Sequence, residues 1–386
     1  FNAVFPLKVN QYPNFVCPLI EGTKSLNYGL EAGSKAELLI AMAYNNENAP
    51  ITVNGFKDKE MIIQGFLAKQ QGHNITLTLE GINELETIVE VQKELQLPSP
   101  NIGLRVRLHS GGSGTWAKSG GINSKFGLSA TEIIEAYEIM EKNNLLDSLK
   151  MIHFHIGSSM NKIAPLKKAL KESGHIYAQL KKMGAHALDS INIGGGLAIE
   201  YSQFENSKEY SLQEFSNDVV FTLQTIAINK DVKAPNIYIE SGRFVAAPSA
   251  ILVAPVLELF SSEYEESHLK LKENDPDIIK ELYALYKDMT SKTAREFMHD
   301  ALEHLESILT LFDLGYVDLQ DRSNAEILTN LIIKKSISFL GINDYTELKR
   351  FEDRIQEKYL LNFSIFQSLP DFWGIDQEFP IMPLTH

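Results

Sequence analysis

NITLTLEGINELETIVEVQKELQLPSPNIGLRVRL (residues 74–108) carries the pattern that decides the fold. A β-rich run over residues 74–80 is followed by residues 81–95, in which apolar side chains recur at a spacing of three to four. A second β-rich run then covers residues 102–108. These periods predict a strand, an amphipathic helix and another strand. Two strands joined by such a helix form a parallel pair covered by that helix.

The same unit recurs along residues 1–255. Further strands are predicted at 3–8, 28–32, 51–55, 149–155, 189–195 and 236–241, with amphipathic runs between them. Eight such units fit a closed (β/α)8 barrel, the α/β architecture called a TIM barrel, better than an open doubly wound sheet. In that barrel the active site lies at the carboxyl ends of the strands.

Composition narrows the class of protein. The chain has 386 residues and a formal net charge of −14, so nucleic acid and anionic membranes are poor partners. Its one cysteine, Cys17, excludes a disulfide framework and fits a reducing compartment, so we expect a cytoplasmic location. No run of 18 apolar residues predicts a transmembrane helix. The ends, FNAVFPLKVN and FPIMPLTH, suggest that the sequence is part of a longer protein.

Polar side chains gather where the predicted strands end. These residues are Lys8, Glu31, Asn54, Arg105, Arg107, His155 and Glu240, and the glycine triplet Gly194 to Gly196 follows the seventh predicted strand in the same way. A lone lysine at a strand end is ordinarily solvated, and a lone histidine or glycine triplet has an ordinary structural explanation. Their shared position at one end of a barrel instead indicates a functional site.

Two glycine motifs predict a phosphate site. Without Cβ atoms, the backbone of Gly194–Gly196 can approach an anion closely, and Gly242 and Arg243 follow the next strand. Barrels often bind phosphate at the loops after strands seven and eight. An amine, an imidazole, a carboxylate and a phosphate cradle together suit pyridoxal 5'-phosphate, whose ring acts as an electron sink.

Several motifs resemble one enzyme family closely. FPLKVNQ, YGLEAGSKAEL, HFHIGSS, INIGGGLAIEY and ESGR are similar to bacterial biosynthetic arginine decarboxylases, and so is the stretch GLRVRLHSGGSGTWAKSGGINSKFGL. These enzymes belong to the alanine-racemase-like, fold type III pyridoxal-phosphate decarboxylases. The resemblance implies decarboxylation of L-arginine to agmatine and CO2, at the start of polyamine and spermidine biosynthesis. It also implies a use of Mg2+, for which the sequence shows no site.

The resemblance also implies roles for matching residues. Lys8, His155 and Glu240 would be catalytic: Lys8 would bind the cofactor covalently, His155 would stack on its ring, and Glu240 would face the pyridine nitrogen. Cofactor binding is implied for Lys8, Glu31, Arg105, His155, Ser158, Gly194, Gly195, Gly196, Glu240, Gly242 and Arg243, with Glu37 nearby. Substrate contacts are implied for Ile191, Asn192, Ile193, Gly194, Gly195, Gly196, Leu197, Ala198, Ile199, Glu200 and Tyr201.

The composition changes after residue 255. No glycine occurs between Gly242 and Gly315, and the apolar spacing predicts helices after a start signal at Asp275 and Pro276. We therefore expect a helical bundle over 256–358, followed by the start of a C-terminal β-domain at 359–386. The side chains of His299, Asp300, Glu303 and His304 suggest a metal site, but a solvated helix face explains them better.

One departure from the family leaves alternatives open. The family supplies a catalytic cysteine from a neighbouring subunit, in a Cys-Asp-Ser-Asp-Gly motif that this sequence lacks, and Cys17 lies in the apolar stretch NFVCPLI. We expect the motif beyond residue 386, in a homodimer or homotetramer with shared active sites. A decarboxylase of ornithine, lysine or diaminopimelate, or a non-catalytic homologue that binds the cofactor, stays an alternative.

Overall fold

The computed structural model describes residues 1–109, 126–201, 208–260, 264–340 and 357–384. The chain divides into two compact units. The first, the barrel unit, contains residues 1–251 and 369–386. The second, the helical unit, contains residues 252–368.

The barrel unit is built on a closed barrel of eight strands that pair in sequence order, with β1 also pairing with β8. Every neighbouring pair is parallel. The strands are β1 (Asn2–Pro6), β2 (Gly29–Ala32), β3 (Pro50–Val53), β4 (Asn74–Leu79), β5 (Asn101–Arg105), β6 (Leu149–His153), β7 (Ser190–Asn192) and β8 (Asn236–Ile239). The predicted barrel is therefore confirmed.

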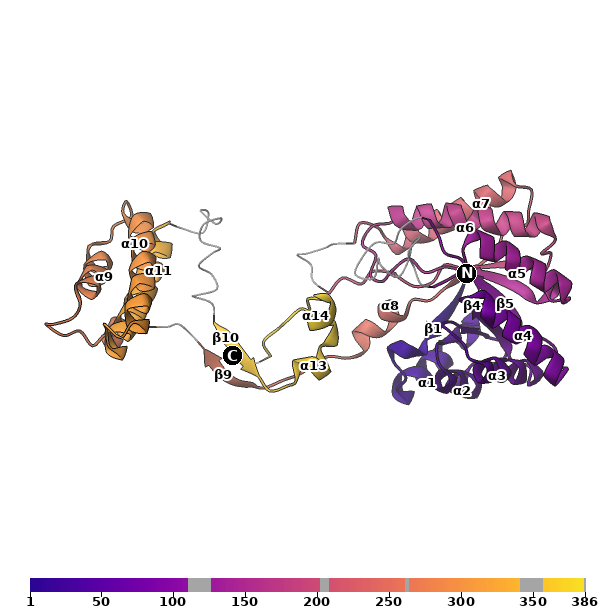
Figure 1. Ribbon diagram of the computed structural model, residues 1–386, viewed down its shortest axis with the longest axis horizontal. Helices are drawn as coiled ribbons and strands as arrows, with labels where there is room; N and C mark the ends of the chain where they lie inside the picture. Colours follow the sequence, from indigo (N-terminus) through magenta and orange to yellow (C-terminus); the bar gives the residue numbers. More distant parts are fainter. Residues whose placement is uncertain (110–125, 202–207, 261–263, 341–356, 385–386) are drawn as a thin grey trace. The chain divides into compact units, whose positions relative to one another are not determined.

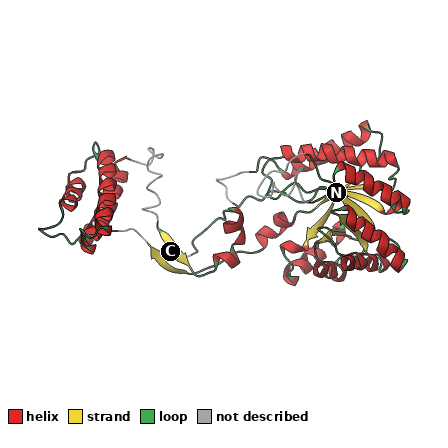
Figure 2. Cartoon of the chain, viewed as in Figure 1, coloured by secondary structure: helices red, strands yellow, loops and turns green. Residues whose placement is uncertain are grey.

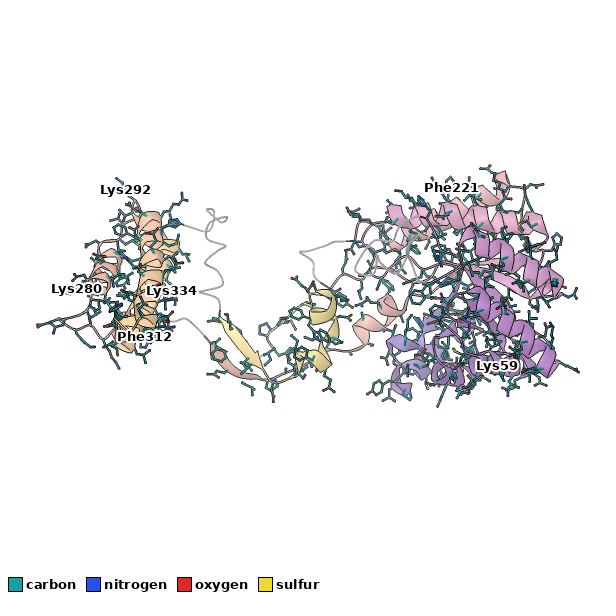
Figure 3. The ribbon with its side chains drawn as sticks, viewed as in Figure 1. Lys59, Phe221, Lys280, Lys292, Phe312 and Lys334 are labelled. Carbon is teal, nitrogen blue, oxygen red and sulfur yellow. The ribbon has the colours of Figure 1, made fainter. Side chains whose placement is uncertain are left out.

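Helices surround the strands, as Figures 1 and 2 show for the barrel unit. They are α1 (Pro13–Gly22), α2 (Lys35–Tyr44), α3 (Lys59–Gln70), α4 (Ile82–Leu95), α5 (Ala130–Lys142), α6 (Ala164–Met183) and α7 (Leu212–Asn229). The barrel unit also contains two shorter helices, α8 (Gly242–Ala246) and α14 (Pro370–Ile375). Side-chain caps fix several starts, because Ser34, Asp58 and Ser129 each accept a hydrogen bond from an amide in the first turn. On the outer surface, Lys59 (labelled in Figure 3) pairs with Glu90 and Glu94 of α4.

The core lies between the strands and these helices. Phe5, Leu30, Ile51 and Leu77 are fully buried, as parallel strands covered on both faces require. Helix α3 packs tightly on β4 at Gly65, where an added Cβ would lie 2.9 Å from the methyl carbons of Leu77.

The strands end earlier than the sequence predicts, and this moves several polar residues into loops. Strand β1 ends at Pro6, so Lys8 lies in the short 3-10 turn Leu7–Val9. His155 lies two residues after β6, and Glu240 directly follows β8. The polar side chains still lie at the predicted end of the barrel, because each follows the last residue of its strand by no more than two positions.

The helical unit contains α9 (Asp277–Asp288), α10 (Ala294–Asp313) and α11 (Leu319–Leu340). Buried apolar side chains hold them together, among them Ile279, Leu305 and Leu328. The predicted start at Pro276 is the N-cap of α9, but the expected long helical run breaks at residues 289–293. Arg322 lies 5.0 Å over the ring of Phe312, which Figure 3 labels.

An antiparallel two-stranded sheet, β9 (Val256–Phe260) with β10 (Lys358–Leu361), belongs to the same unit. Within 359–386, where we expect a β-domain to start, the structure has β10, α13 (Ile365–Ser368) and α14, so that expectation stays a prediction. Residues 110–125, which hold most of the insert that resembles the arginine enzyme, lie outside the described residues. Among the helices of the described ranges, none has the length and apolar character needed to cross a membrane.

Candidate functional site

A cavity of about 1000 Å³ lies within the barrel unit at the carboxyl ends of its strands. Most of the cofactor-binding residues predicted from the sequence line it, namely Lys8, Glu31, Arg105, His155, Ser158, Gly195, Gly196, Glu240, Gly242 and Arg243. Asn54, His153 and Asp371 also line the cavity. The barrel thus gathers residues from positions 8 to 371 into one site.

The predicted substrate segment is divided. Gly195, Gly196, Leu197 and Tyr201 line the cavity. The side chains of Ile191, Ile193 and Ala198 are buried in the protein interior, and Glu200 is exposed and accepts a hydrogen bond from the amide of Lys208. Ile199 is half-buried. Glu37 does not line the cavity, and its carboxylate accepts hydrogen bonds from Gln11 and from the amide of Gly33.

Glu240 is the best-connected acid in the cavity. Its Oε1 atom accepts hydrogen bonds from Asn54 Nδ2 at 2.8 Å and Asn192 Nδ2 at 2.7 Å. The Nε2 atom of His153 lies 3.6 Å from the same oxygen. Both hydrogen bonds use Oε1, and no described residue donates to Oε2, which leaves that oxygen for a ligand in the cavity.

The two buried acids, Glu240 and Glu31, have opposite protonation preferences. Burial raises the pKa of Glu240, but the charge of His153, the hydrogen bond from Asn54 and the charge of Lys8 outweigh burial and hold that pKa far below its usual range. Burial, with the charge of Glu240 adding to it, raises the pKa of Glu31 to about 8. Near neutral pH, Glu240 is therefore a carboxylate and Glu31 is largely a neutral carboxylic acid.

His155 is a neutral ring. Burial lowers its pKa to about 3, and the nearby Arg105 cation contributes to the shift. Its Nδ1 atom accepts a hydrogen bond of 3.3 Å from the amide of Gly195, so the proton of the neutral ring is on Nε2. This contact also fixes the orientation of the ring against the glycine triplet.

The glycine triplet is required by close backbone approaches. A Cβ on Gly195 would lie 2.3 Å from the carbonyl oxygen of Glu240, and one on Gly194 would lie 2.5 Å from that of Phe154. Gly194 and Gly196 also have positive φ angles of 70° and 110°. Side chains at these positions would push apart the loops that carry His155 and Glu240.

Arg243 has protein partners at the edge of the cavity. Its Nη2 atom donates to Asp371 Oδ2 at 2.8 Å, and its Nη1 atom donates to the Tyr201 hydroxyl at 3.4 Å. Lys8, in contrast, is exposed, so the apolar surroundings suggested by FPLKVNQ are not found. The neighbouring Phe5 and Leu7 side chains point into the core instead.

Sequence reasoning missed four polar residues of this region: His153, Asn192 as a partner of Glu240, Glu80 and Asp371. His153 could have been found, since residues two apart on a strand point to the same face and His155 was already a candidate. Glu80 could also have been found, because it is the last residue of the predicted strand 74–80, just as the candidate Glu31 is the next-to-last residue of the predicted strand 28–32. Asn192 and Asp371 gave no comparable signal.

No metal site is present among the described residues, which contain no group of three or more His, Cys, Asp or Glu side chains suited to holding an ion. His304, one of the four residues considered for a metal, lies 3.5 Å from Glu281. No residue is therefore assigned to Mg2+.

The barrel and its cavity define a class of protein. Residues 1–247 match the family "Pyridoxal-dependent decarboxylase, pyridoxal binding domain". The chain therefore belongs to the pyridoxal-dependent decarboxylases, and its cofactor is pyridoxal phosphate. Within that class, residues 272–349 match the "Arginine decarboxylase helical bundle domain".

The chain is also similar to individual decarboxylases over its whole length. The chain is 40% identical over 397 residues to the biosynthetic arginine decarboxylase of Geobacter sp. (strain M21), covering 100% of this chain and 62% of that protein. The crystal structure of the biosynthetic arginine decarboxylase of Campylobacter jejuni superposes with a TM-score of 0.88 at 61% identity, covering 100% of this chain and 61% of that one. The chain thus spans about three fifths of these relatives, and the predicted family resemblance is confirmed.

A more distant structure shares the barrel. The diaminopimelate decarboxylase of M. jannaschii has a TM-score of 0.57 and 26% identity, covering 68% of this chain and 58% of that one.

The cavity fits the family's cofactor. Both carboxylate oxygens of Glu31 and the Nδ1 atom of His153 are buried without a hydrogen-bond partner among the described residues, whereas His153 Nε2 faces Glu240 Oε1 at 3.6 Å. Buried polar atoms ordinarily have partners, so these atoms indicate where a polar ligand belongs. With the Lys8 amine and the free Oε2 atom of Glu240, the site offers an amine and an acid to such a ligand.

Proposed function

We propose that the protein to which this chain belongs decarboxylates L-arginine to agmatine and CO2, with pyridoxal phosphate bound in the barrel cavity. The observation that carries the proposal is an ionised Glu240, held by two amide donors, in one cavity with the Lys8 amine. Arginine is the proposed substrate because the helical unit matches the bundle of arginine decarboxylases and similar relatives have that name. The product would enter polyamine biosynthesis in the cytoplasm.

Several residues would hold the cofactor. Glu240 would face the pyridine nitrogen through Oε2, and the neutral His155 ring would lie against the ring face. Ser158, Gly195, Gly196, Gly242 and Arg243 would surround the phosphate. When bound, the cofactor supplies an electron sink for the charge left by the departing carboxylate.

Each side chain has a separate task in this proposal. Glu240 keeps a negative charge at Oε2, which favours a proton on the nitrogen that faces it. His155 excludes water from the ring face without adding a charge. Glu31 holds a proton on its carboxyl group close to Lys8. The Lys8 Nζ atom accepts and releases protons while the substrate binds and the product leaves.

The substrate assignment has a direct test. The full-length protein, loaded with pyridoxal phosphate, is assayed side by side for CO2 release from arginine, ornithine, lysine and diaminopimelate. We expect the highest kcat/KM for arginine. Preference for another of the four amino acids would correct the substrate, and CO2 release from none of them by cofactor-loaded protein would contradict the proposed activity.

We also propose a homodimer or homotetramer with shared sites, because the family resemblance implies a cysteine from a neighbouring subunit. Lys8→Ala and a mutant of that cysteine, each inactive alone, should regain activity when mixed and reassociated. About a quarter of the sites would then combine an intact barrel with an intact cysteine if mixing is random. Heterodimers that form without activity would contradict shared sites.

A further inference from the structure

Glu80 joins two strand ends at the cavity through a single atom. Its side chain directly follows β4 and has no exposed surface. The Oε1 atom accepts a hydrogen bond of 3.0 Å from the amide of Gly55 and one of 2.8 Å from Arg105 Nη1. The loop after β3 and the end of β5 are therefore tied to the same carboxylate.

The first connection leads to Glu240. Gly55 follows Asn54 in the chain, so the bond to Glu80 fixes the peptide group that joins the two residues. Asn54 then donates to Glu240. Gly55 has a positive φ of 74°, so the chain turns sharply at this point. A shift of the Gly55 amide would move the Asn54 donor away from the acid.

The second connection leads to Arg105, which lines the cavity. The Arg105 guanidinium, with 12% of its side chain exposed, lies between Glu80 and the cavity and 5.0 Å from the ring centre of Phe126. The Glu80 carboxylate holds this cation in place and balances its charge.

A separate buried ion pair, Lys57 with Glu84, supports the loop after β3. Lys57 Nζ lies 3.2 Å from Glu84 Oε2 and donates to the carbonyl oxygens of Gly55 and Thr78. Glu84 also accepts hydrogen bonds from the amides of Lys57 and Glu80. This pair holds the loop as a whole, whereas Glu80 contacts both the peptide group next to Asn54 and Arg105.

We propose that Glu80 is a positioning residue, which sets the geometry of Glu240 through Gly55 and Asn54 and holds Arg105 at the cavity. Glu80 does not line the cavity, so it acts only through these neighbours. The inference rests on the proposed role of Glu240 toward the cofactor.

The test compares the variants Glu80→Gln and Glu80→Asp with the full-length wild type. The first keeps the size of the side chain and removes its charge, and the second keeps the charge but withdraws the oxygens by one methylene. Ile88→Val is the control, because it removes a methyl group from the core face of α4 at a fully buried position away from the cavity. Measurements are the Tm of the cofactor-free protein, the Kd for pyridoxal phosphate, the visible circular dichroism per bound cofactor, and kcat and KM.

For Glu80→Gln we expect a changed visible circular dichroism and a kcat lower by about 10- to 100-fold, with KM nearly unchanged, since misplaced groups cost about this much. Glu80→Asp should lie between Glu80→Gln and the wild type. Ile88→Val should lower Tm and leave the dichroism per bound cofactor unchanged.

Wild-type dichroism and kcat in the Glu80 variants, or changes that Ile88→Val reproduces at an equal loss of Tm, would overturn the inference. If Glu80→Gln does not fold, Glu80→Asp decides by the same criteria. Cofactor binding and dichroism do not require turnover, so these two measurements still test the inference if the protein does not decarboxylate arginine.

Discussion

Asn54 Nδ2 donates a hydrogen bond of 2.8 Å to Oε1 of Glu240, a residue 186 positions away in the sequence. The two residues follow β3 and β8, and Asn192, the last residue of β7, donates to the same oxygen. An amide cannot lose its proton at ordinary pH, so both contacts favour the ionised form of Glu240 at all such pH values.

Replacing Asn54 with alanine should weaken this acid. The variant Asn54→Ala removes one of two donors to a buried carboxylate, and a hydrogen bond to a charged group contributes about 1.5–3 kcal/mol. We expect kcat to fall about 10- to 100-fold, measured by CO2 release. Asn74→Ala, which alters a half-buried asparagine at the amino end of β4, is the matched control. Equal kcat values in the two variants would count against the role of Asn54.

Glu240→Gln should lower kcat more than it lowers cofactor affinity. Glutamine keeps the size of the side chain but carries no charge, so it no longer stabilises a proton on the pyridine nitrogen that it would face. If the charge contributes roughly 3 kcal/mol at the transition state, kcat falls by about two orders of magnitude. Steady-state kinetics and a cofactor titration measure the two effects. A near-normal kcat would show that another residue is the acid.

Lys8 should be the residue that binds the cofactor covalently. The Lys8 amine lies at the cavity, on the 3-10 turn after β1. Lys57, another lysine of the barrel unit, is instead buried and paired with Glu84. Borohydride reduction of the loaded protein, followed by peptide mass spectrometry, should find the cofactor on the peptide that contains Lys8. Lys8→Ala should carry no label. A cofactor trapped on a different lysine would refute the assignment.

Glu31 should make stability depend on pH. Its pKa is raised to about 8 in the folded chain from a reference value of 4.5, so between these values the folded state keeps a proton that the unfolded state has released. Rising pH therefore favours unfolding, and the loss from this group approaches about 1.4 kcal/mol per pH unit. Below pH 4.5 both states are protonated and the effect vanishes.

The measurement is urea unfolding of the cofactor-free protein between pH 5 and pH 8. We expect Glu31→Gln to become more stable relative to the wild type as the pH rises through this range. Glu47→Gln, which alters an exposed carboxyl group in the turn before β3, should show no such trend. A wild-type pH slope in Glu31→Gln would mean that Glu31 is ionised when folded.

The sequence by itself determined the barrel and the end of the barrel where the site lies. Alternation of β-rich runs with helical spacing is a local property, and parallel strands covered on both faces must be apolar, as Ile51 and Leu77 are. Because the carboxyl ends of all strands in such a barrel lie together, Lys8, His155 and Glu240 could be expected at one site before any distance was known.

Only the tertiary structure decided which of these residues contact one another. Barrel closure places β8 beside β1 and turns Asn54 and Asn192 toward Glu240, and it places Arg105 against Glu80. In the folded chain, Lys8 is exposed and Arg243 is paired with Asp371. Hydrogen bonds require distances near 3 Å between atoms far apart in sequence, and those distances depend on strand register and loop geometry, which local periodicity does not specify.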